Sequence, residues 1–409
     1  MNRSILAALG AALLLSPGVA VALEEFHGFV ETAWGIRTTE VPAAPSDYVL
    51  DETRGQLRLN AFGEQGEAFL RLDFLHDRVQ GGAAELEMRE GFLRFTTLGD
   101  HLDVKAGRQA LTWGTGDLIF INDLFPKDWV SFFAGREDQY LKAPSDAVRL
   151  GIFGLPVDLD VVVASGFTPD RMPDGTRLVF ASPVAGGVPT LPNAALGNAE
   201  IAARASRYVG DFTAALYTYH GFFPTPACVS PGGSVPTLTY PALSAHGASL
   251  RGPLGPGIAW AETGLYDSRD DRDGTDPFVP NSSARWLAGY EVPLSTDFNL
   301  TLQYYGERQL DYDAYLAHLD GAVPDDEDYT LLTARAEKWL RYQTVRLSLF
   351  AFHSPTVEET HIRALASVKL SDEIEAALGA GLFAGDYARG RFSRFDDNDH
   401  VFLRFRYGF

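Results

Sequence analysis

The sequence predicts an all-β fold, a transmembrane antiparallel β-barrel of about 18 strands. Three observations predict it: the pattern of the last strand, an export signal at the N-terminus, and segments that alternate between apolar and polar residues along most of the chain. Hydrophobic residues make up 46% of the 409 residues, yet the mean hydropathy is −0.07. Apolar and polar residues therefore alternate rather than cluster, as expected for strands with one face in lipid and one in water.

The C-terminal segment 400–409 has the alternation of a strand with two different faces. Arg404 and Arg406 point to one face, because strand side chains alternate with a period of two. The opposite face is apolar up to the last residue of the chain: Val401, Leu403, Phe405, Tyr407 and Phe409. This pattern resembles the last strand of bacterial outer-membrane β-barrels, and the resemblance implies that the barrel-assembly machinery is a partner through Phe409.

The N-terminus has the parts of a secretory signal peptide. A short basic start at Arg3 precedes an apolar stretch over residues 5–15, and residues 20–22 form an Ala-Val-Ala cleavage site. The apolar stretch is shorter than the roughly 20 residues that a membrane-spanning helix needs. We therefore expect residues 1–22 to be removed. Residues 23–409 would form a single barrel in a bacterial outer membrane, in contact with its lipid and lipopolysaccharide.

Alternating segments recur along the chain, with short and long connections in strict turn. Eighteen strands are predicted, near residues 26–37, 54–63, 67–78, 86–97, 101–112, 146–154, 157–168, 198–208, 211–222, 245–254, 257–267, 284–294, 297–308, 330–340, 343–353, 361–370, 373–385 and 399–409. Connections after even-numbered strands are tight, and those after odd-numbered strands are mostly long. Short periplasmic turns and long extracellular loops are typical of a transmembrane barrel. Sixteen strands is the alternative count, because strand boundaries are soft.

Composition and motifs exclude several other classes of protein. The net charge of −20 argues against nucleic acid as a partner. The nine histidines are scattered, and the sequence contains neither a Gly-x-Ser-x-Gly nor a Cys-x-x-Cys-His motif. The fragment Asp271-x-Asp273-Gly274 has Arg269 at the first ligand position of a calcium loop, so a metal site is not predicted. We expect no enzymatic activity and no cofactor.

The polar face of the predicted strands carries basic residues on two groups of strands that meet when the barrel closes. We expect these side chains to line the lumen: Arg58, Arg71, Arg94, Lys105, Arg335, Arg346, Arg363, Lys369, Arg404 and Arg406. Rings of Arg and Lys in a pore favour anions, because fixed positive charge stabilises an anion that has lost part of its water. Alternatively, these residues keep the lumen wet and pair with inward-facing acids.

The long connection at 113–145 combines large aromatic residues with both signs of charge. With the end of the preceding strand, it supplies the residues that we expect at an inward-folded constriction: Arg108, Trp113, Asp117, Asp123, Lys127, Asp128, Trp129, Arg136 and Glu137. A loop with an apolar side and a charged side suits packing on the inner wall of a barrel. We expect some of its acids to lie opposite Arg58, Arg71 or Lys105. The alternative is a loop that caps the outer rim.

Arg108 breaks the pattern of its strand. Strict alternation from Val104 and Ala106 points Arg108 toward lipid, which costs about 2–4 kcal/mol at the membrane midplane. We therefore expect a β-bulge at Gly107, which would turn Arg108 inward against the acids of the loop.

The same stretch resembles a known family. Gly107-Arg108-Gln109 is followed by Trp113-Gly114, Asp117 and Pro126. This run resembles a porin-like family of outer-membrane β-barrels, whose relatives look like alginate-export and substrate-selective porins. The resemblance covers residues 100–150 and implies a channel without naming a solute.

The function predicted is passive diffusion of small solutes, anionic or carboxylated, through a channel narrowed by the 113–145 loop. The alternative is a structural or interaction barrel that does not conduct. Such a barrel would contact lipopolysaccharide, a polymer or a protein through the acidic segments 267–276, 309–329 and 396–399. Those segments could equally form a solvated charged surface.

Overall fold

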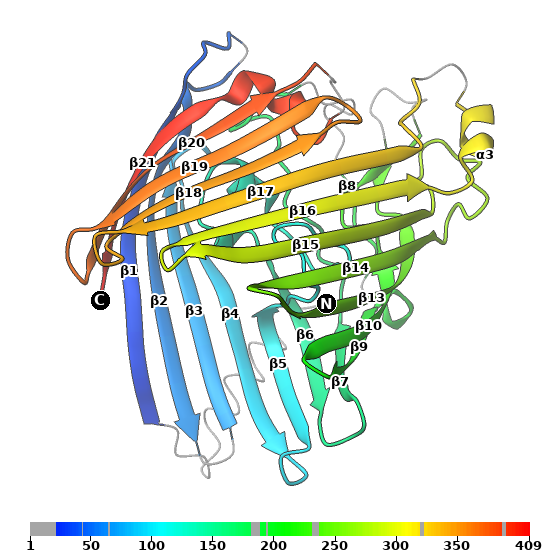
Figure 1. The fold of residues 1–409 in the computed structure, drawn as a ribbon, viewed down its shortest axis with the longest axis horizontal. Coiled ribbons are helices and arrows are strands. Elements are labelled where there is room, and N and C mark those ends of the chain that lie inside the picture. Colours follow the sequence, from blue (N-terminus) through cyan, green and yellow to red (C-terminus); the bar gives the residue numbers. More distant parts are fainter. Residues whose placement is uncertain are drawn as a thin grey trace.

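The computed structural model describes residues 22–42, 44–63, 66–180, 189–193, 195–230, 237–319, 323–386 and 390–409. Among these residues, eighteen strands form one antiparallel sheet that closes into a barrel (Figure 1). The predicted fold is confirmed, and the alternative count of sixteen strands is wrong. The predicted signal peptide, residues 1–22, lies outside the described residues except for Ala22.

The barrel strands lie close to the predicted segments. They are β1 (Ala22–Arg37), β2 (Tyr48–Gly63), β3 (Gly66–Asp77), β4 (Ala84–Thr97), β5 (Leu102–Ala110), β6 (Pro144–Ile152), β7 (Asp158–Ala164), β9 (Glu200–Val209), β10 (Phe212–Phe222), β13 (Ala242–Leu254), β14 (Gly257–Ser268), β15 (Ser283–Ser295), β16 (Phe298–Gln309), β17 (Asp328–Leu340), β18 (Val345–Ser354), β19 (Glu359–Lys369), β20 (Ile374–Ala384) and β21 (His400–Gly408).

The connections contain the remaining elements. These are the helices α2 (Trp129–Phe133) and α3 (Tyr312–Ala317), the 3₁₀ helices η1 (Asp138–Tyr140), η2 (Leu196–Asn198) and η3 (Ser393–Asn398), and a small sheet of β8 (Pro189–Thr190), β11 (Ala227–Ser230) and β12 (Thr237–Thr239). In the described part of the chain, no helix is long and apolar enough to cross a membrane.

The first and last strands close the barrel. β1 pairs with β2 on one side and with β21 on the other, from Phe29 opposite Gly408 to Arg37 opposite His400. The last residue completes this ladder, because the amide of Phe409 donates to the carbonyl of Gly28 and the amide of Gly28 donates to the carbonyl of Phe409, both at 2.9 Å. Closure therefore pairs both edge strands of the barrel sheet, whose backbone groups lipid could not satisfy.

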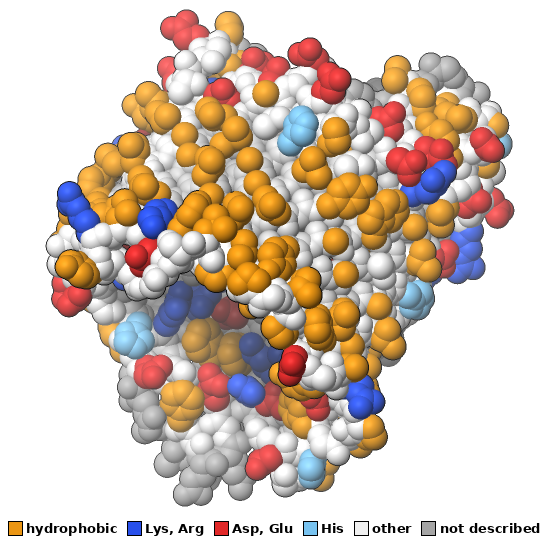
Figure 2. All heavy atoms as spheres, in the orientation of Figure 1, with side chains coloured by type: hydrophobic (Ala, Val, Ile, Leu, Met, Phe, Trp, Pro, Cys, Tyr) orange, Lys and Arg blue, Asp and Glu red, His pale blue; other side chains and the backbone are white. Residues whose placement is uncertain are grey.

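Alternation separates an apolar outer face from a polar interior. On the outer face, Leu57, Leu347 and Leu403 are each about two-fifths exposed. Inward neighbours such as Gln56 and Asp73 are buried. Figure 2 shows a belt of apolar side chains (orange) across the strands on the visible face of the barrel. This arrangement is the one expected for a wall that faces hydrocarbon outside and polar groups inside.

The predicted bulge at Gly107 is wrong. β4 and β5 pair without a shift there, with Phe92 opposite Gly107 and Gly91 opposite Arg108. Gly107 instead has a φ of +133° because its backbone lies so close to β4 that an added Cβ would be 2.3 Å from the carbonyl oxygen of Gly91.

The irregularity lies one strand away, between β3 and β4. Arg71 pairs with Glu90 and Leu72 with Met88, so Arg89 is the extra residue. Arg108 forms ion pairs with two carboxylates on the neighbouring strands, at 3.3 Å from Asp146, its partner in the β5–β6 ladder, and at 3.6 Å from Glu87. The expected pairing with the loop acids is wrong, because the adjacent strand ends already supply carboxylates.

Thiol labelling can check the two faces at one pair of neighbours. After Cys228→Ser, we expect Arg346→Cys to react with a charged, water-soluble maleimide severalfold faster than Leu347→Cys, because Arg346 borders an inner cavity and Leu347 is on the outer face. Faster labelling at position 347 than at position 346 would contradict the register.

Candidate functional site

Residues 111–143, which we call the inserted loop, leave the wall after β5 and run inside the barrel. Their first anchor is Glu262 of β14, whose buried carboxylate accepts hydrogen bonds from the Thr115 amide at 2.7 Å and the Asn122 amide at 2.9 Å. The second is Gln303 of β16, which accepts from the Asp117 amide at 2.7 Å and donates to its carbonyl at 2.8 Å. A buried carboxylate without partners would be costly, so these bonds fix the loop against the far side of the barrel.

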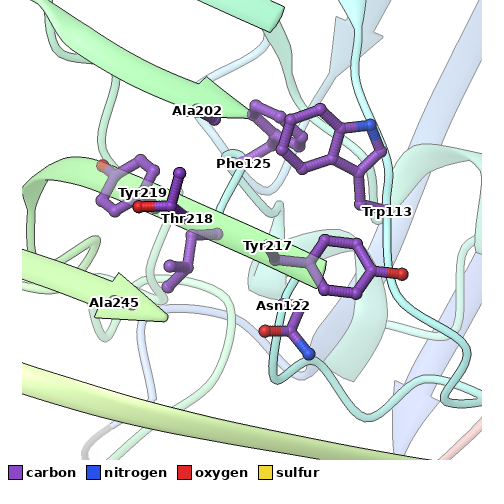
Figure 3. A pocket seen from close by; sticks show the side chains of 9 residues that line it. Trp113, Asn122, Phe125, Ala202, Tyr217, Thr218, Tyr219 and Ala245 are labelled. Atoms are coloured by element: carbon purple, nitrogen blue, oxygen red, sulfur yellow. The ribbon is translucent and has the colours of Figure 1, made fainter. Parts of the chain in front are cut away.

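Aromatic packing supports the same side of the inserted loop. Trp113 lies edge-on to Phe125, with ring centroids 5.0 Å apart, and tilts against Tyr217 of β10 at 6.2 Å. Figure 3 shows these rings with Ala202 and Ala245, two small residues of the wall that leave room for them. A fully buried ring of this size stabilises the packed state by about 1.5–3 kcal/mol.

The short helix α2 carries a second aromatic cluster. Asp128 caps it by accepting a hydrogen bond from the Ser131 amide at 2.8 Å. Phe132 packs on Phe352 of β18, and Phe133 packs on Phe395 near the end of the chain, with centroids 5.6 and 4.7 Å apart. The inserted loop is therefore fixed at both ends of its path.

Residues 135–138 form the loop tip, which turns on a glycine. Gly135 has a φ of +77°, and an added Cβ would lie 2.5 Å from the ring of Phe402 on β21. The next residue, Arg136, has a side chain that is 10% exposed and forms ion pairs with Glu52 at 2.5 Å and Asp77 at 3.4 Å. Burial alone would lower the pKa of Arg136, but the Glu52 carboxylate beside it raises that pKa above its ordinary value. Arg136 thus stays charged and holds the tip to β2 and β3.

The acids of the loop tip meet an arginine wall, which we define as the inward arginines of β17 to β21: Arg335, Arg346, Arg363, Arg404 and Arg406. Glu137 lies 2.8 Å from Arg406 and 3.8 Å from Arg404. Asp138 lies 2.9 Å from Arg363 and 3.5 Å from Arg335. Burial opposes ionisation of both acids, yet the arginines outweigh it and hold the pKa of Glu137 and of Asp138 below their ordinary values. Both acids are therefore ionised near neutral pH.

Asp117 behaves differently although it shares an arginine with Asp138. Its carboxylate lies 2.8 Å from Nε of Arg335. Here burial outweighs the arginine and raises the pKa of Asp117 to about 6. Asp117 is consequently the loop acid whose charge is most sensitive to pH.

A cavity of about 170 Å³ lies beside the loop tip and the arginine wall and is lined by both, and we call it the tip cavity. Its described lining includes five arginines, three acids and three phenylalanine rings: Arg136, Arg335, Arg346, Arg363, Arg404, Glu137, Asp138, Glu375, Phe133, Phe350 and Phe402. Figure 2 shows a hollow at one end of the barrel with Lys and Arg side chains (blue) deep inside it.

Rings hold the arginines of the wall in place. The guanidinium of Arg335 lies 4.3 Å from the ring centre of Phe350, and that of Arg363 lies 4.7 Å from the ring centre of Phe132. An arginine stacked on a ring keeps its N–H edges free for carboxylates. The arrangement can therefore bind an anion at the edges of fixed guanidinium groups.

The remaining predicted basic residues lie away from the loop acids. Arg58 donates to Gln139 at 3.2 Å, while Lys105 lies 3.7 Å from the ring centre of Phe92. Two others pair with acids of adjacent strands, Arg71 with Glu90 at 3.1 Å and Arg94 with Asp103 at 2.8 Å. Lys369 is exposed at the end of β19.

The predicted partners of the loop acids, Arg58, Arg71 and Lys105, are therefore wrong. The inserted loop crosses the barrel, so its acids reach the arginine wall on β17 to β21 instead. On β2 to β5, acidic side chains of the strands neutralise much of the basic charge. Glu90, for example, pairs with Arg71.

Other charged residues of the inserted loop bind one another. Lys127 and Lys142 share the buried carboxylate of Asp123, at 3.0 and 2.5 Å. Burial raises the pKa of Asp123, but the two lysines outweigh it and lower that pKa below its ordinary value. This cluster shapes the loop and does not border the tip cavity.

Sequence reasoning missed several residues that position the loop. Glu52, Arg89, Glu262 and Gln303 are buried on inward faces of strands. Arg89 donates to the carbonyls of Gln139 and Lys142, at 2.7 and 2.8 Å. The alternation of the strands does place these polar residues on the inward face. It does not tell which of the inward polar residues bind the inserted loop.

The connection between β7 and β9 also enters the barrel, a feature that the sequence did not suggest. Its Arg171 accepts a backbone hydrogen bond from Trp129 at 3.0 Å, and Asp170 accepts from the Trp129 indole at 2.7 Å. Further along, the buried Arg177 contacts Asp77 and the carbonyl of Val49. This second loop therefore covers part of the inserted loop.

Solved structures share the closed antiparallel barrel of this chain. Acinetobacter baumannii OccAB4 aligns with a TM-score of 0.58 at 9% identity, over 96% of this chain and 100% of that one. Pseudomonas aeruginosa OccD3 (OpdP) aligns with a TM-score of 0.57 at 10% identity, over 96% and 93%.

A third structure, Pseudomonas aeruginosa OccK5 (OpdH), gives a TM-score of 0.57 at 8% identity over 94% of this chain and 97% of that one. No protein-family model matches the chain, and no curated protein matches it. At such low identity the likeness establishes a shared fold. The predicted porin-like barrel is confirmed at that level.

Asp170 makes the contact between the two loops sensitive to pH. Burial raises the pKa of Asp170 from 3.8 to about 6. The contact is therefore strongest below about pH 4, where aspartate is protonated even in the unfolded chain, and weakens as pH rises through 6. We expect the Arg171 amide, which donates to the Lys127 carbonyl at 2.8 Å, to be less protected from hydrogen exchange at pH 7 than at pH 5, after correction for the intrinsic rate. Asp170→Asn should abolish this difference; an unchanged pH dependence in that variant would contradict the assignment.

Proposed function

We propose that this protein is a passive channel of the bacterial outer membrane for small solutes, with a preference for carboxylates. The observation that carries the proposal is the tip cavity, where four arginines of the arginine wall face a loop that lies inside a closed barrel. The shared fold of outer-membrane porins and the predicted signal peptide support the same location and role.

The exposure of charged groups inside the barrel supports a water-filled path. The side chain of Asp138 is 41% exposed and that of Arg346 is 33% exposed. A barrel filled by its own side chains would bury such groups, because an exposed charge needs water as its neighbour. Solutes the size of a small acid can therefore reach the arginine wall.

The chemistry of the wall favours carboxylates over other anions. A guanidinium group presents parallel N–H donors that match the two oxygens of a carboxylate. Ions that shed part of their water in a narrow pore gain most from such fixed donors. The loop acids reduce the net positive charge, so we expect a moderate rather than a strict preference for anions.

A non-conducting barrel is the second candidate, and one observation favours it. Two loops occupy the interior, and the second places Arg177 and Leu178 in buried positions near β2. In that case the acidic segments would contact lipopolysaccharide, a polymer or a protein. A barrel blocked by its loops passes no current, so conductance separates the two candidates.

The C-terminus supports a proposal about assembly. The amide and carbonyl of Phe409 bond to Gly28 in the closed barrel. These groups and the edge of β21 are unpaired before closure, which leaves a strand edge available for another strand. We propose that the barrel-assembly machinery recognises this edge and Phe409.

Conductance tests the channel and the role of the inserted loop. In planar bilayers the purified protein should give single-channel currents. Deleting residues 118–135 should raise conductance severalfold, because this removes α2 and the rings that hold the loop inside the barrel. Heat-resistant migration on gels should show that the variant still folds. A folded variant with unchanged conductance would mean that the loop does not narrow the path.

Reversal potentials in a salt gradient test the arginine wall. We expect a preference for anions in the unmodified protein, and Arg346→Glu should reduce or invert it because Arg346 borders the tip cavity. The control is Arg308→Glu, an exposed arginine at the rim that pairs with Glu327, which should change the preference little. Cation preference in the unmodified protein would show that the acids control permeation.

A further inference from the structure

We infer that Asp138 is an internal ligand of the arginine wall. Its carboxylate occupies the position between Arg335 and Arg363 that the carboxylate of a passing solute takes in turn. Asp138 thereby sets how tightly the channel binds carboxylates. The inference rests on the proposed function, because it assumes that solutes reach the tip cavity.

The geometry around Asp138 is that of a bound carboxylate. Its two oxygens lie on two guanidinium groups, one 2.9 Å from Arg363 and the other 3.5 Å from Arg335. A carboxylate that spans two arginines is a strong and directional arrangement. A free carboxylic acid of similar size would make the same contacts.

The two arginines would stay in place without Asp138. Arg335 stacks on Phe350 and pairs with Asp117 at 2.8 Å. Arg363 stacks on Phe132 and donates to the carbonyl of Arg136 at 3.2 Å. Because each guanidinium has these other contacts, the binding position is preformed and a solute need not assemble it.

Asp138 can exchange with a solute, whereas other acids of the interior cannot. Its side chain is 41% exposed and borders the tip cavity, so water competes for its ion pairs. By contrast, the side chains of Glu31 and Glu52 are 5% and 2% exposed. Buried carboxylates of that kind neutralise arginines permanently, because an unpaired arginine left in their place would be costly.

Glu375 provides a matched control on the opposite side of the cavity. It lines the same cavity as Asp138, and among the described residues it has no ion pair. Neutralising Glu375 therefore removes the same negative charge from the same space without releasing an arginine. Any effect found for Asp138→Asn and not for Glu375→Gln comes from release of the arginine pair.

The test measures binding of propionate to single channels, with chloride as the reference anion. Both Asp138→Asn and Glu375→Gln should raise the preference for chloride over potassium by similar amounts. Asp138→Asn should lower the apparent Kd for propionate about tenfold more than Glu375→Gln does, because it also releases a charge-assisted hydrogen bond for the solute. Should the asparagine variant not fold, Asp138→Ala carries the same expectation.

Equal propionate affinity in the two variants, with a conducting unmodified protein, would overturn the role of Asp138 and leave the channel intact. An unmodified protein that passes no current would overturn the proposed function and this inference together. The additional tenfold gain at position 138 would support both.

Discussion

Closure of the barrel between β1 and β21 is the constraint on which the rest of the structure depends. It satisfies the last open strand edges, and it also builds part of the site. Glu31 of β1 pairs with Arg406 of β21 at 2.5 Å, and with Arg404 at 3.6 Å. Those arginines in turn receive Glu137 of the inserted loop. An open sheet would leave these charges on opposite edges, so Glu31 meets Arg404 and Arg406 only in the closed barrel.

The inserted loop separates two physical tasks along its length. Its rings and the bonds to Glu262 and Gln303 fix it in place, through apolar burial and through hydrogen bonds to a buried carboxylate and a buried amide. Its tip carries ion pairs, which add little net stability once desolvation is included. Asp138 is the more exposed acid of the tip, with 41% of its side chain accessible, so its charge can change at little cost to the fold. The rings and anchors hold the loop, and Asp138 borders the tip cavity.

The sequence predicts the wall far better than it predicts the contacts inside it. Period-two alternation identifies which face each strand turns inward, because that property is local. Which side chains meet across the lumen depends on the path of a loop, and that path is set by residues such as Glu262, almost 150 positions from its partner Thr115. The bulge at Arg89 of β4 could not be predicted either. The residue pattern around Gly107, where a bulge was expected, gives no sign of an irregularity on the neighbouring strand. Local rules therefore predict the fold, and the site needs the tertiary structure.

Counting arginines in a pore overstates its preference for anions. In this barrel Arg346 pairs with Glu337 at 2.5 Å, and Arg363 pairs with Asp138 at 2.9 Å. A solute inside the barrel interacts with the net charge that remains after such pairs form. Charged groups in contact with water contribute most to it, because the charges of buried pairs already cancel. Asp138 of the loop tip, whose side chain is 41% exposed, is the member of these pairs that a solute can replace in the proposed channel. In the proposed channel, the preference for anions therefore depends less on the number of arginines in the wall than on the few carboxylates of the loop that face them.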